Sequence, residues 1–183
     1  MSEKNNGAPK SSAQDFVFSR VFDAPRELVW KAWTEPGRLE QWWGPKGFTL
    51  QVAKFDLRPG GEFHYSTSGP AGLPMTGKMW GKFVYREIVR PEKIVFVNSF
   101  SDESGGITRH PMSPTWPLEV LNTQTFSEHQ GKTTVTLRGG PINATELERS
   151  TFVLGHTPMQ VGFAGTFDQL AAYLANELRK ATG

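Results

Sequence analysis

One apolar stripe near the C-terminus limits most strongly what this chain can fold into. Two capping-box patterns, Asn143 with Glu146 and Thr157 with Gln160, predict helix starts just before it. From Met159 onward, apolar side chains recur every three or four residues, at Phe163, Phe167, Leu170, Leu174 and Leu178. This spacing places them on one face of an α-helix of about 20 residues, on the order of 30 Å long. No other segment of the sequence predicts a helix of this length.

The central part of the sequence, from about residue 48 to residue 138, predicts a run of β-strands. Apolar and polar residues alternate there with the period of two expected of strands that bury one face. Turn-forming residues interrupt the alternation, as in the Arg-Pro-Gly-Gly segment 58–61. Within segment 48–57 the apolar positions shift phase by one residue. This shift predicts a β-bulge, and bulges curve a sheet.

The N-terminal part adds one strand and two short helices. Segment 16–22 has the alternation of a strand, and helices are predicted to begin at Pro25 and Pro36, because proline is favoured at the first helical position. The second helix is predicted to end at Gly44, which can adopt a left-handed cap, and Pro45, which cannot continue a helix.

The order of these elements predicts an α+β fold of the helix-grip type. A curved antiparallel sheet with one apolar face must bury that face against another element, and only the C-terminal helix is long enough. We therefore expect about six or seven strands wrapped around that helix, with the two short helices after the first strand. A single domain is predicted over residues 15–181. Residues 1–14 lack a regular apolar pattern and are predicted to be a disordered tail.

Composition excludes several kinds of site. The chain has no cysteine, which excludes disulfides, thiolate catalysis and cysteine-ligated metals. Its 20 basic residues are scattered, whereas nucleic-acid binding needs a basic patch, so no nucleic-acid partner is predicted. No apolar run approaches the roughly 20 residues that span a bilayer, and the N-terminus lacks the apolar core of a secretory signal. We therefore expect a cytoplasmic protein with no membrane span.

Five segments, in this order, resemble one known family: APRELVWKAWTEPGRLEQWWGP, FDLRPGGEF, VRPEKIVF, GKTTVTL and GFAGTFDQLAAYL. The family is that of the C-terminal domain of the activator of heat-shock protein 90 ATPase, within the START-like, birch-pollen-allergen-like (SRPBCC) superfamily. The resemblance covers roughly residues 15–178. It implies a helix-grip fold whose helix leaves a groove for a hydrophobic ligand.

Two departures from the family pattern limit what the resemblance implies. The co-chaperone that names the family carries an additional N-terminal domain, for which a sequence of 183 residues has no room beside the predicted domain. The heat-shock-protein partnership is therefore not implied by default. Many family members also have a tryptophan where this chain has Phe163, so the pocket is expected to differ in shape.

No catalytic residue, metal ligand or cofactor is predicted. The four histidines lack the spacing of a metal site, and no nucleophile-elbow or phosphate-loop motif is present. His64 stands between Phe63 and Tyr65 in a predicted strand, so alternation places it on the opposite, solvated face. Spacing alone does not reveal whether a histidine pairs with a residue distant in the sequence.

Amides in apolar strand rows are the strongest sign of an interior site. Asn98 shares a row with Phe96 and Phe100, while Asn122 and Gln124 share another. Binding pockets combine apolar walls with a few convergent polar groups. The alternative is that these rows meet solvent, or that the aromatic residues form plain core. The predicted cavity residues are Trp80, Phe83, Phe96, Asn98, Asn122, Met159, Phe163 and Phe167.

Three tryptophans are predicted at the cavity mouth. Trp42 and Trp43 are adjacent, so about 100° of helix separates their directions. One is expected to pack as a plug and the other to border the mouth. Trp116 ends a long loop, residues 101–117, which is expected to gate the cavity.

The sequence therefore predicts binding of a small apolar or aromatic molecule between sheet and helix. Two alternatives stay open. The first is a stress-related chaperone cofactor that acts through protein contacts. The second is an enzyme of the cyclase or dehydratase type, which would use the same cavity and would need an ionisable group inside it.

Overall fold

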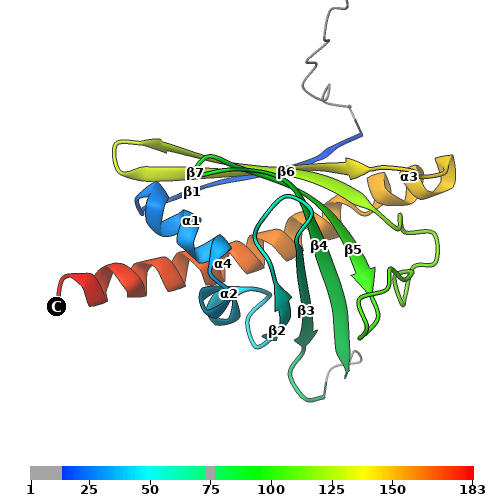
Figure 1. Ribbon diagram of the computed structural model, residues 1–183, viewed down its shortest axis with the longest axis horizontal. Helices are drawn as coiled ribbons and strands as arrows, with labels where there is room; N and C mark the ends of the chain where they lie inside the picture. Colours follow the sequence, from blue (N-terminus) through cyan, green and yellow to red (C-terminus); the bar gives the residue numbers. More distant parts are fainter. Residues whose placement is uncertain (1–13, 73–76) are drawn as a thin grey trace, which may run out of the picture.

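The computed structural model describes residues 14–72 and 77–183, so residues 1–13 of the predicted tail lie outside the described part of the chain. Seven antiparallel strands form one sheet in the order β1-β7-β6-β5-β4-β3-β2 (Figure 1). In chain order the elements are β1 (Phe16–Phe22), α1 (Arg26–Thr34), α2 (Pro36–Trp42), β2 (Thr49–Phe55), β3 (Glu62–Ser68), β4 (Lys78–Val89), β5 (Lys93–Ser101), β6 (Val120–His129), β7 (Lys132–Pro141), α3 (Glu146–Leu154) and α4 (His156–Ala181).

Two register shifts bend the sheet. One lies in β2 between Val52 and Lys54, and the other lies in β4 between Tyr85 and Glu87. An extra residue in one strand of a pair increases local twist and bends that strand. The phase change predicted in segment 48–57 is therefore confirmed as a bulge. The resulting curvature gives the sheet a concave face (Figure 1).

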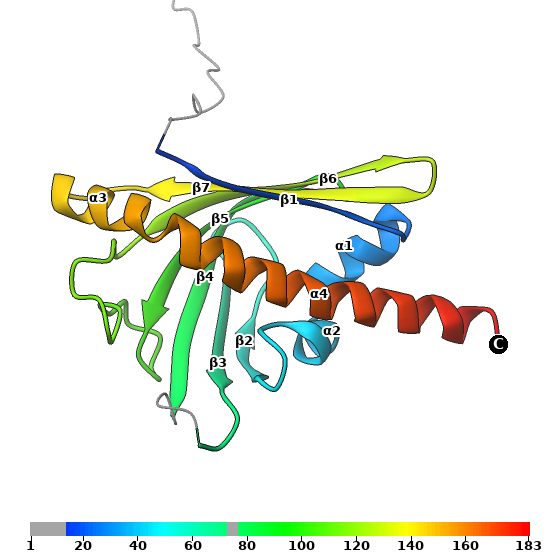
Figure 2. The ribbon, with the colours of Figure 1, turned by 180° about the vertical axis from the view of Figure 1, so that it is seen from behind.

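Helix α4 crosses this concave face, as Figure 2 shows. Phe167, Leu170 and Leu174 are at most 2% exposed. Phe167 contacts the rings of Phe18 and Phe22 from β1, with centroid distances of 5.0 and 5.7 Å. The apolar stripe of the C-terminal helix thus packs on the inner side of the sheet, and the helix-grip fold predicted from the sequence is confirmed.

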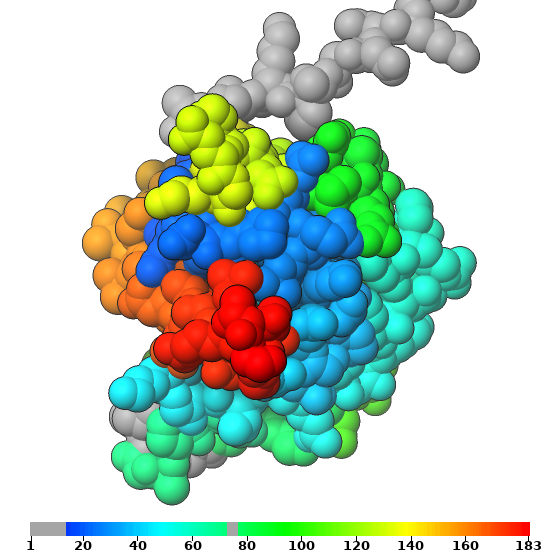
Figure 3. Space-filling view, turned by 90° about the vertical axis from the view of Figure 1, so that its left-hand side faces the viewer, coloured from blue at the N-terminus to red at the C-terminus, as the bar shows by residue number. Residues whose placement is uncertain are grey.

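Helices α1 and α2 close one end of the groove beneath α4. Helix α4 packs against both of them, and its C-terminal end stands in front of them in Figure 3. Arg38 of α2 donates hydrogen bonds to the Tyr173 hydroxyl (2.8 Å) and to Glu177 (3.2 Å), both on α4. Because this end is tied to the helix, the space between sheet and helix is left at the other half of the groove.

The helix starts before the stripe differ from both predictions. The capping box is formed by Thr145 and Glu148, and Asn143 precedes it in the left-handed region with φ of 50°. Helix α4 begins at His156, directly after Gly155, so Thr157 lies inside the first turn. Pro158, the third residue of α4, is tolerated in the first turn because the N–H that proline lacks would have no intrahelical partner there. Capping-box spacing recurs within a few residues of this segment, and the spacing alone does not identify the copy that forms the cap.

Candidate ligand cavity

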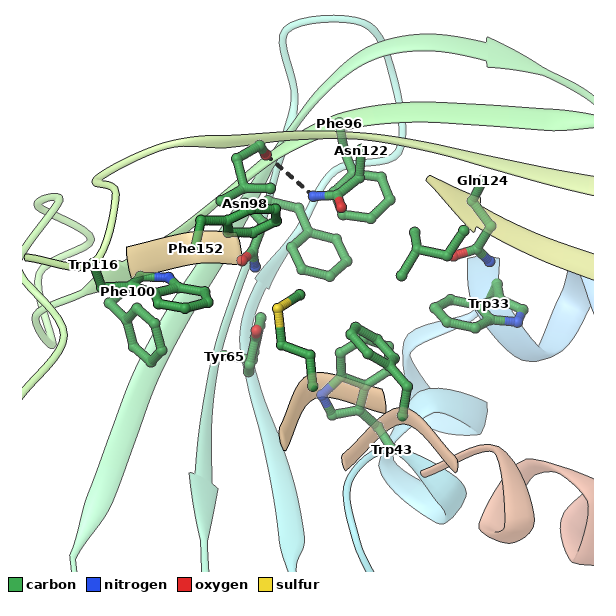
Figure 4. Close-up of a pocket in the computed structure, with 15 residues that line it drawn as sticks. Trp33, Trp43, Tyr65, Phe96, Asn98, Phe100, Trp116, Asn122, Gln124 and Phe152 are labelled. Carbon is green, nitrogen blue, oxygen red and sulfur yellow. Dashed lines mark hydrogen bonds between the residues drawn. The ribbon is translucent and has the colours of Figure 1, made fainter. Parts of the chain in front are cut away.

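A cavity of about 210 Å³ lies between the inner face of the sheet and the N-terminal half of α4 (Figure 4). Strands β3 to β7 supply one wall, while Met159 and Phe163 of α4 supply the other. Phe83 and Phe96 stack face to face on the sheet wall, with ring centroids 4.1 Å apart. The walls are therefore mainly aromatic.

The structure brings together six of the eight residues predicted to line a cavity. They come from β4, β5, β6 and α4, and they are Phe83, Phe96, Asn98, Asn122, Met159 and Phe163. Asn98 is paired with Phe83 across the β4–β5 ladder, and Asn122 with Phe96 across the β5–β6 ladder. Directly paired residues point to the same face of a sheet, so the two amides share the inner face with the aromatic rings.

Trp80 and Phe167, the other two predicted residues, lie elsewhere. Trp80 is three residues from Phe83 in a regular strand, so its side chain points to the outer face. There its ring stacks on His64, with centroids 4.9 Å apart. Phe167 is fully buried in the core between β1 and α1, where it contacts Trp33 at 5.9 Å. Neither residue lines the 210 Å³ cavity.

The two adjacent tryptophans have different environments. Trp42 is 3% exposed, and its indole Nε1 donates a hydrogen bond to the Ala32 carbonyl at 3.0 Å. Trp43 lines the cavity and lies edge-on to Phe83 at 5.8 Å. Trp43 is the C-cap of α2, with φ −64° and ψ 130°. Because this φ is helical, its Cβ keeps the direction of the next helical position, about 100° around the axis from that of Trp42.

Trp116 also lines the cavity, and the loop that carries it is tied to α3. Its ring packs against Phe152 at 5.4 Å. Arg109 donates hydrogen bonds to the Trp116 carbonyl (3.2 Å) and to Glu148 (2.9 Å). The bond from Arg109, together with the backbone N–H of Thr145, lowers the pKa of Glu148 below that of an ordinary glutamate. Glu148 therefore stays ionised and keeps the loop attached at neutral pH.

Several cavity residues were not predicted from the sequence. They are Trp33, Tyr65, Phe100, Val120, Gln124, Leu137 and Phe152. Strand alternation already placed four of them on inner rows, since Tyr65 follows Phe63, Phe100 follows Asn98, and Val120 and Gln124 flank Asn122. No sequence signal indicates that Trp33 and Phe152, on the short helices, face the same space.

Polar groups are held close to glycines on neighbouring strands. A Cβ on Gly139 would lie 2.3 Å from Asn122 Oδ1, and one on Gly81 would lie 2.7 Å from the Tyr65 hydroxyl. Asn122 Nδ2 donates to the Val120 carbonyl at 3.1 Å (Figure 4). Burial raises the pKa of Tyr65 to about 12, although a hydrogen bond with Asn98 acts in the opposite direction. The Tyr65 phenol is therefore neutral at physiological pH.

His64 is not solvated, so that expectation was wrong. Its side chain does point to the outer face, but the residue is only 7% exposed. The chain after β5 folds over it, and its Nε2 lies 3.1 Å from the Asp102 carbonyl oxygen. Across residues 14–72 and 77–183, no three His, Asp or Glu side chains are grouped as metal ligands would be.

Fold and cavity together define a helix-grip domain with an aromatic interior cavity. The family model for "Activator of Hsp90 ATPase homolog 1-like protein" matches residues 23–175. The chain belongs to this family. No curated protein shows significant sequence similarity to it.

Solved structures share the fold over most of the chain. Protein Ms6760 from Mycobacterium smegmatis is 28% identical with a TM-score of 0.70, over 88% of this chain and 90% of that one. A protein from Arthrobacter aurescens is 24% identical with a TM-score of 0.72, over 90% and 87% of the two chains. The AHSA1 protein from Silicibacter pomeroyi is 18% identical with a TM-score of 0.63, over 89% and 99%. The last two similarities concern the fold alone.

Proposed function

We propose that this protein binds a small, largely apolar molecule in the cavity between its sheet and α4. The observation that carries the proposal is the cavity itself, about 210 Å³ in volume and walled by aromatic rings with a few amides among them. This combination of apolar walls and a few polar groups is typical of ligand sites. The described helices include none long and apolar enough to cross a membrane.

The volume limits the size of the ligand. Drug-sized ligands occupy pockets of roughly 300–1,000 Å³, whereas an apolar cavity of about 150 Å³ holds benzene. The volume of this cavity lies between these values. We therefore expect a molecule on the order of one aromatic ring with a short substituent. A ligand of this size forms few contacts, so its affinity is expected to be modest.

Toluene and indole are suitable probes, and we expect both to bind the wild-type protein in calorimetric titrations. The Phe163→Trp variant places a larger ring in the cavity and is expected to weaken binding by about tenfold, or roughly 1.4 kcal/mol. Val161→Trp is the matched control, because Val161 is 70% exposed on the same helix. Equal affinities of the two variants, or no binding to the wild type, would contradict the proposal. Native mass spectrometry of the purified protein tests for a co-purified natural ligand.

A second candidate function is activation of a chaperone ATPase through a protein contact. The family description suggests it. Leu147 of α3, Leu154 at the end of α3 and Val161 of α4 are 62–82% exposed, and these side chains would supply an apolar contact. Stimulation of Hsp90 ATPase activity by the wild type, lost in a variant with all three changed to serine, is the expected result for this candidate. An unchanged ATPase rate removes it.

A further inference from the structure

The Tyr65 hydroxyl and the Asn98 amide form a polar pair on the cavity wall. Tyr65 on β3 is paired with Gly81 on β4, and a Cβ on Gly81 would lie 2.7 Å from the Tyr65 hydroxyl. The phenol therefore lies across the glycine, because only a residue without a side chain leaves room for it. Figure 4 shows the hydroxyl directed toward the amide of Asn98, which belongs to the next strand, β5.

A ligand in the cavity can reach this pair, in contrast to other polar atoms of the wall. The Gln124 amide and the Trp33 indole Nε1 have no hydrogen-bond partner among the described residues, but protein atoms enclose them on all sides. No polar atom of Tyr65 or Asn98 is enclosed and unpartnered in this way. Both residues are half-buried, and both border the 210 Å³ cavity and a second cavity of about 90 Å³.

The hydrogen bond between the two side chains leaves the phenol proton available to a ligand. Burial raises the pKa of Tyr65 to about 12, so the phenol keeps its proton at neutral pH. Asn98 acts on this pKa in the opposite direction, as an amide N–H does when it donates to the phenol oxygen. The hydroxyl itself has one proton to donate, and it donates to no acceptor in the part of the chain that the structure describes. The complementary ligand group is therefore an acceptor.

The walls around the pair exclude a charged acceptor. The described residues that line the cavity include no Asp, Glu, Lys, Arg or His. An ionised ligand group would lose its hydration there without gaining an ionic partner. A carbonyl oxygen meets both conditions, because it is neutral and only accepts hydrogen bonds.

We propose that Tyr65, with Asn98 donating to its oxygen, donates a hydrogen bond to the carbonyl oxygen of a neutral aromatic ketone or aldehyde. This inference rests on the proposed ligand-binding function and specifies the class of ligand. Phe83 is paired with Asn98 across the β4–β5 ladder, and its ring stacks on that of Phe96. The aromatic ring of the ligand lies against this stack, and the hydrogen bond to Tyr65 fixes the direction of the carbonyl.

Acetophenone and α-methylstyrene test the inference, because they differ only in the C=O group of the first and the C=CH₂ group of the second. In calorimetric titrations Tyr65→Phe is expected to weaken acetophenone binding by about fivefold, which corresponds to the loss of one hydrogen bond. The same variant is expected to leave the affinity for α-methylstyrene unchanged or higher. Tyr85→Phe is the matched control, because it removes a phenol hydroxyl from β4 at a residue that does not line the 210 Å³ cavity.

Infrared spectroscopy of bound acetophenone, isotope-labelled at the carbonyl, provides an independent measurement. The C=O stretch is expected at lower frequency in the wild type and in Tyr85→Phe than in Tyr65→Phe, because a hydrogen bond weakens the C=O bond. Equal effects of Tyr65→Phe on the two affinities, or a C=O stretch that this variant does not move, overturn the inference while ligand binding itself stands. The same holds if the wild type binds α-methylstyrene or toluene but not acetophenone. Failure of all three probes to bind the wild type removes both proposals.

Discussion

Phe167→Ala is expected to lower the unfolding free energy by about 3–5 kcal/mol, the usual range for a fully buried phenylalanine. Phe167 has no exposed surface and joins three elements at once. Its ring contacts Phe18 and Phe22 of β1 and Trp33 of α1 at 5.0–5.9 Å. These neighbours all belong to a strand or a helix, so the space vacated by the ring would stay largely empty. Urea denaturation of the purified variant measures the loss.

Phe163→Ala, one turn earlier on α4, is the matched control. Phe163 is only partly buried, contacts Phe16 and Phe18, and borders an existing cavity. Its removal is expected to cost roughly 1–2 kcal/mol, because less apolar surface is re-exposed. The two losses of stability therefore distinguish the half of α4 that packs on β1 and α1 from the half that faces the cavity. Equal losses of stability would mean that Phe163 is packed as tightly as Phe167 in the wild-type protein. The cavity beside it would then not be a stable feature of the fold.

The fold was predictable from the sequence because two periodicities dominate it. The alternation over about residues 48–138 predicted the run of strands that β2 to β7 form. The long stripe of α4 left only one element able to cover the sheet. Helix starts were less certain, because capping residues such as Asn143 and Thr145 recur within a few positions and only tertiary packing selects among them.

Part of the cavity lining also follows from the sequence, whereas the predicted position of Trp80 conflicts with strand alternation. Phe96, Asn98 and Asn122 follow directly from alternation along strands. The prediction that Trp80 lines the cavity beside Phe83 is wrong, because their positions differ by three, an odd number, and strand geometry places them on opposite faces. The register confirms this, since Trp80 is paired with Ser66 and Ser101 on the outer side.

Other features of the site depend on contacts between distant segments. The burial of His64 requires the chain after β5 to fold back over β3, which no local pattern indicates. The isolation of the Gln124 amide depends on Ile94 and Leu137 being its neighbours, and thus on strand order. Sequence periodicity assigns a residue to a face, but it does not reveal which polar atoms on that face remain without partners.

Gly61→Ala is expected to destabilise the protein by about 3 kcal/mol, at the upper end of the cost of overpacking. A Cβ on Gly61 would lie 2.1 Å from the Asp56 carbonyl oxygen and 3.0 Å from that of Arg58. Both are backbone atoms, so no side-chain rotation relieves the contact. Gly61 also accepts a hydrogen bond from the Tyr85 backbone N–H at 2.9 Å, which fixes the turn between β2 and β3 against β4.

Gly60→Ala provides the comparison within the same turn. Gly60 has φ of +84°, but nothing lies within 4 Å of an added Cβ, so only backbone strain of about 1 kcal/mol is expected. Backbone angles alone would rank Gly60 as the more sensitive position, whereas steric contact ranks Gly61 first. Chemical denaturation of both variants decides between these orders, and a larger loss for Gly60→Ala would contradict the steric argument. Because Gly61 holds β3 in register with β4, its substitution is also expected to displace Tyr65 and Phe83 and so to weaken binding of toluene, whereas Gly60→Ala leaves that binding intact.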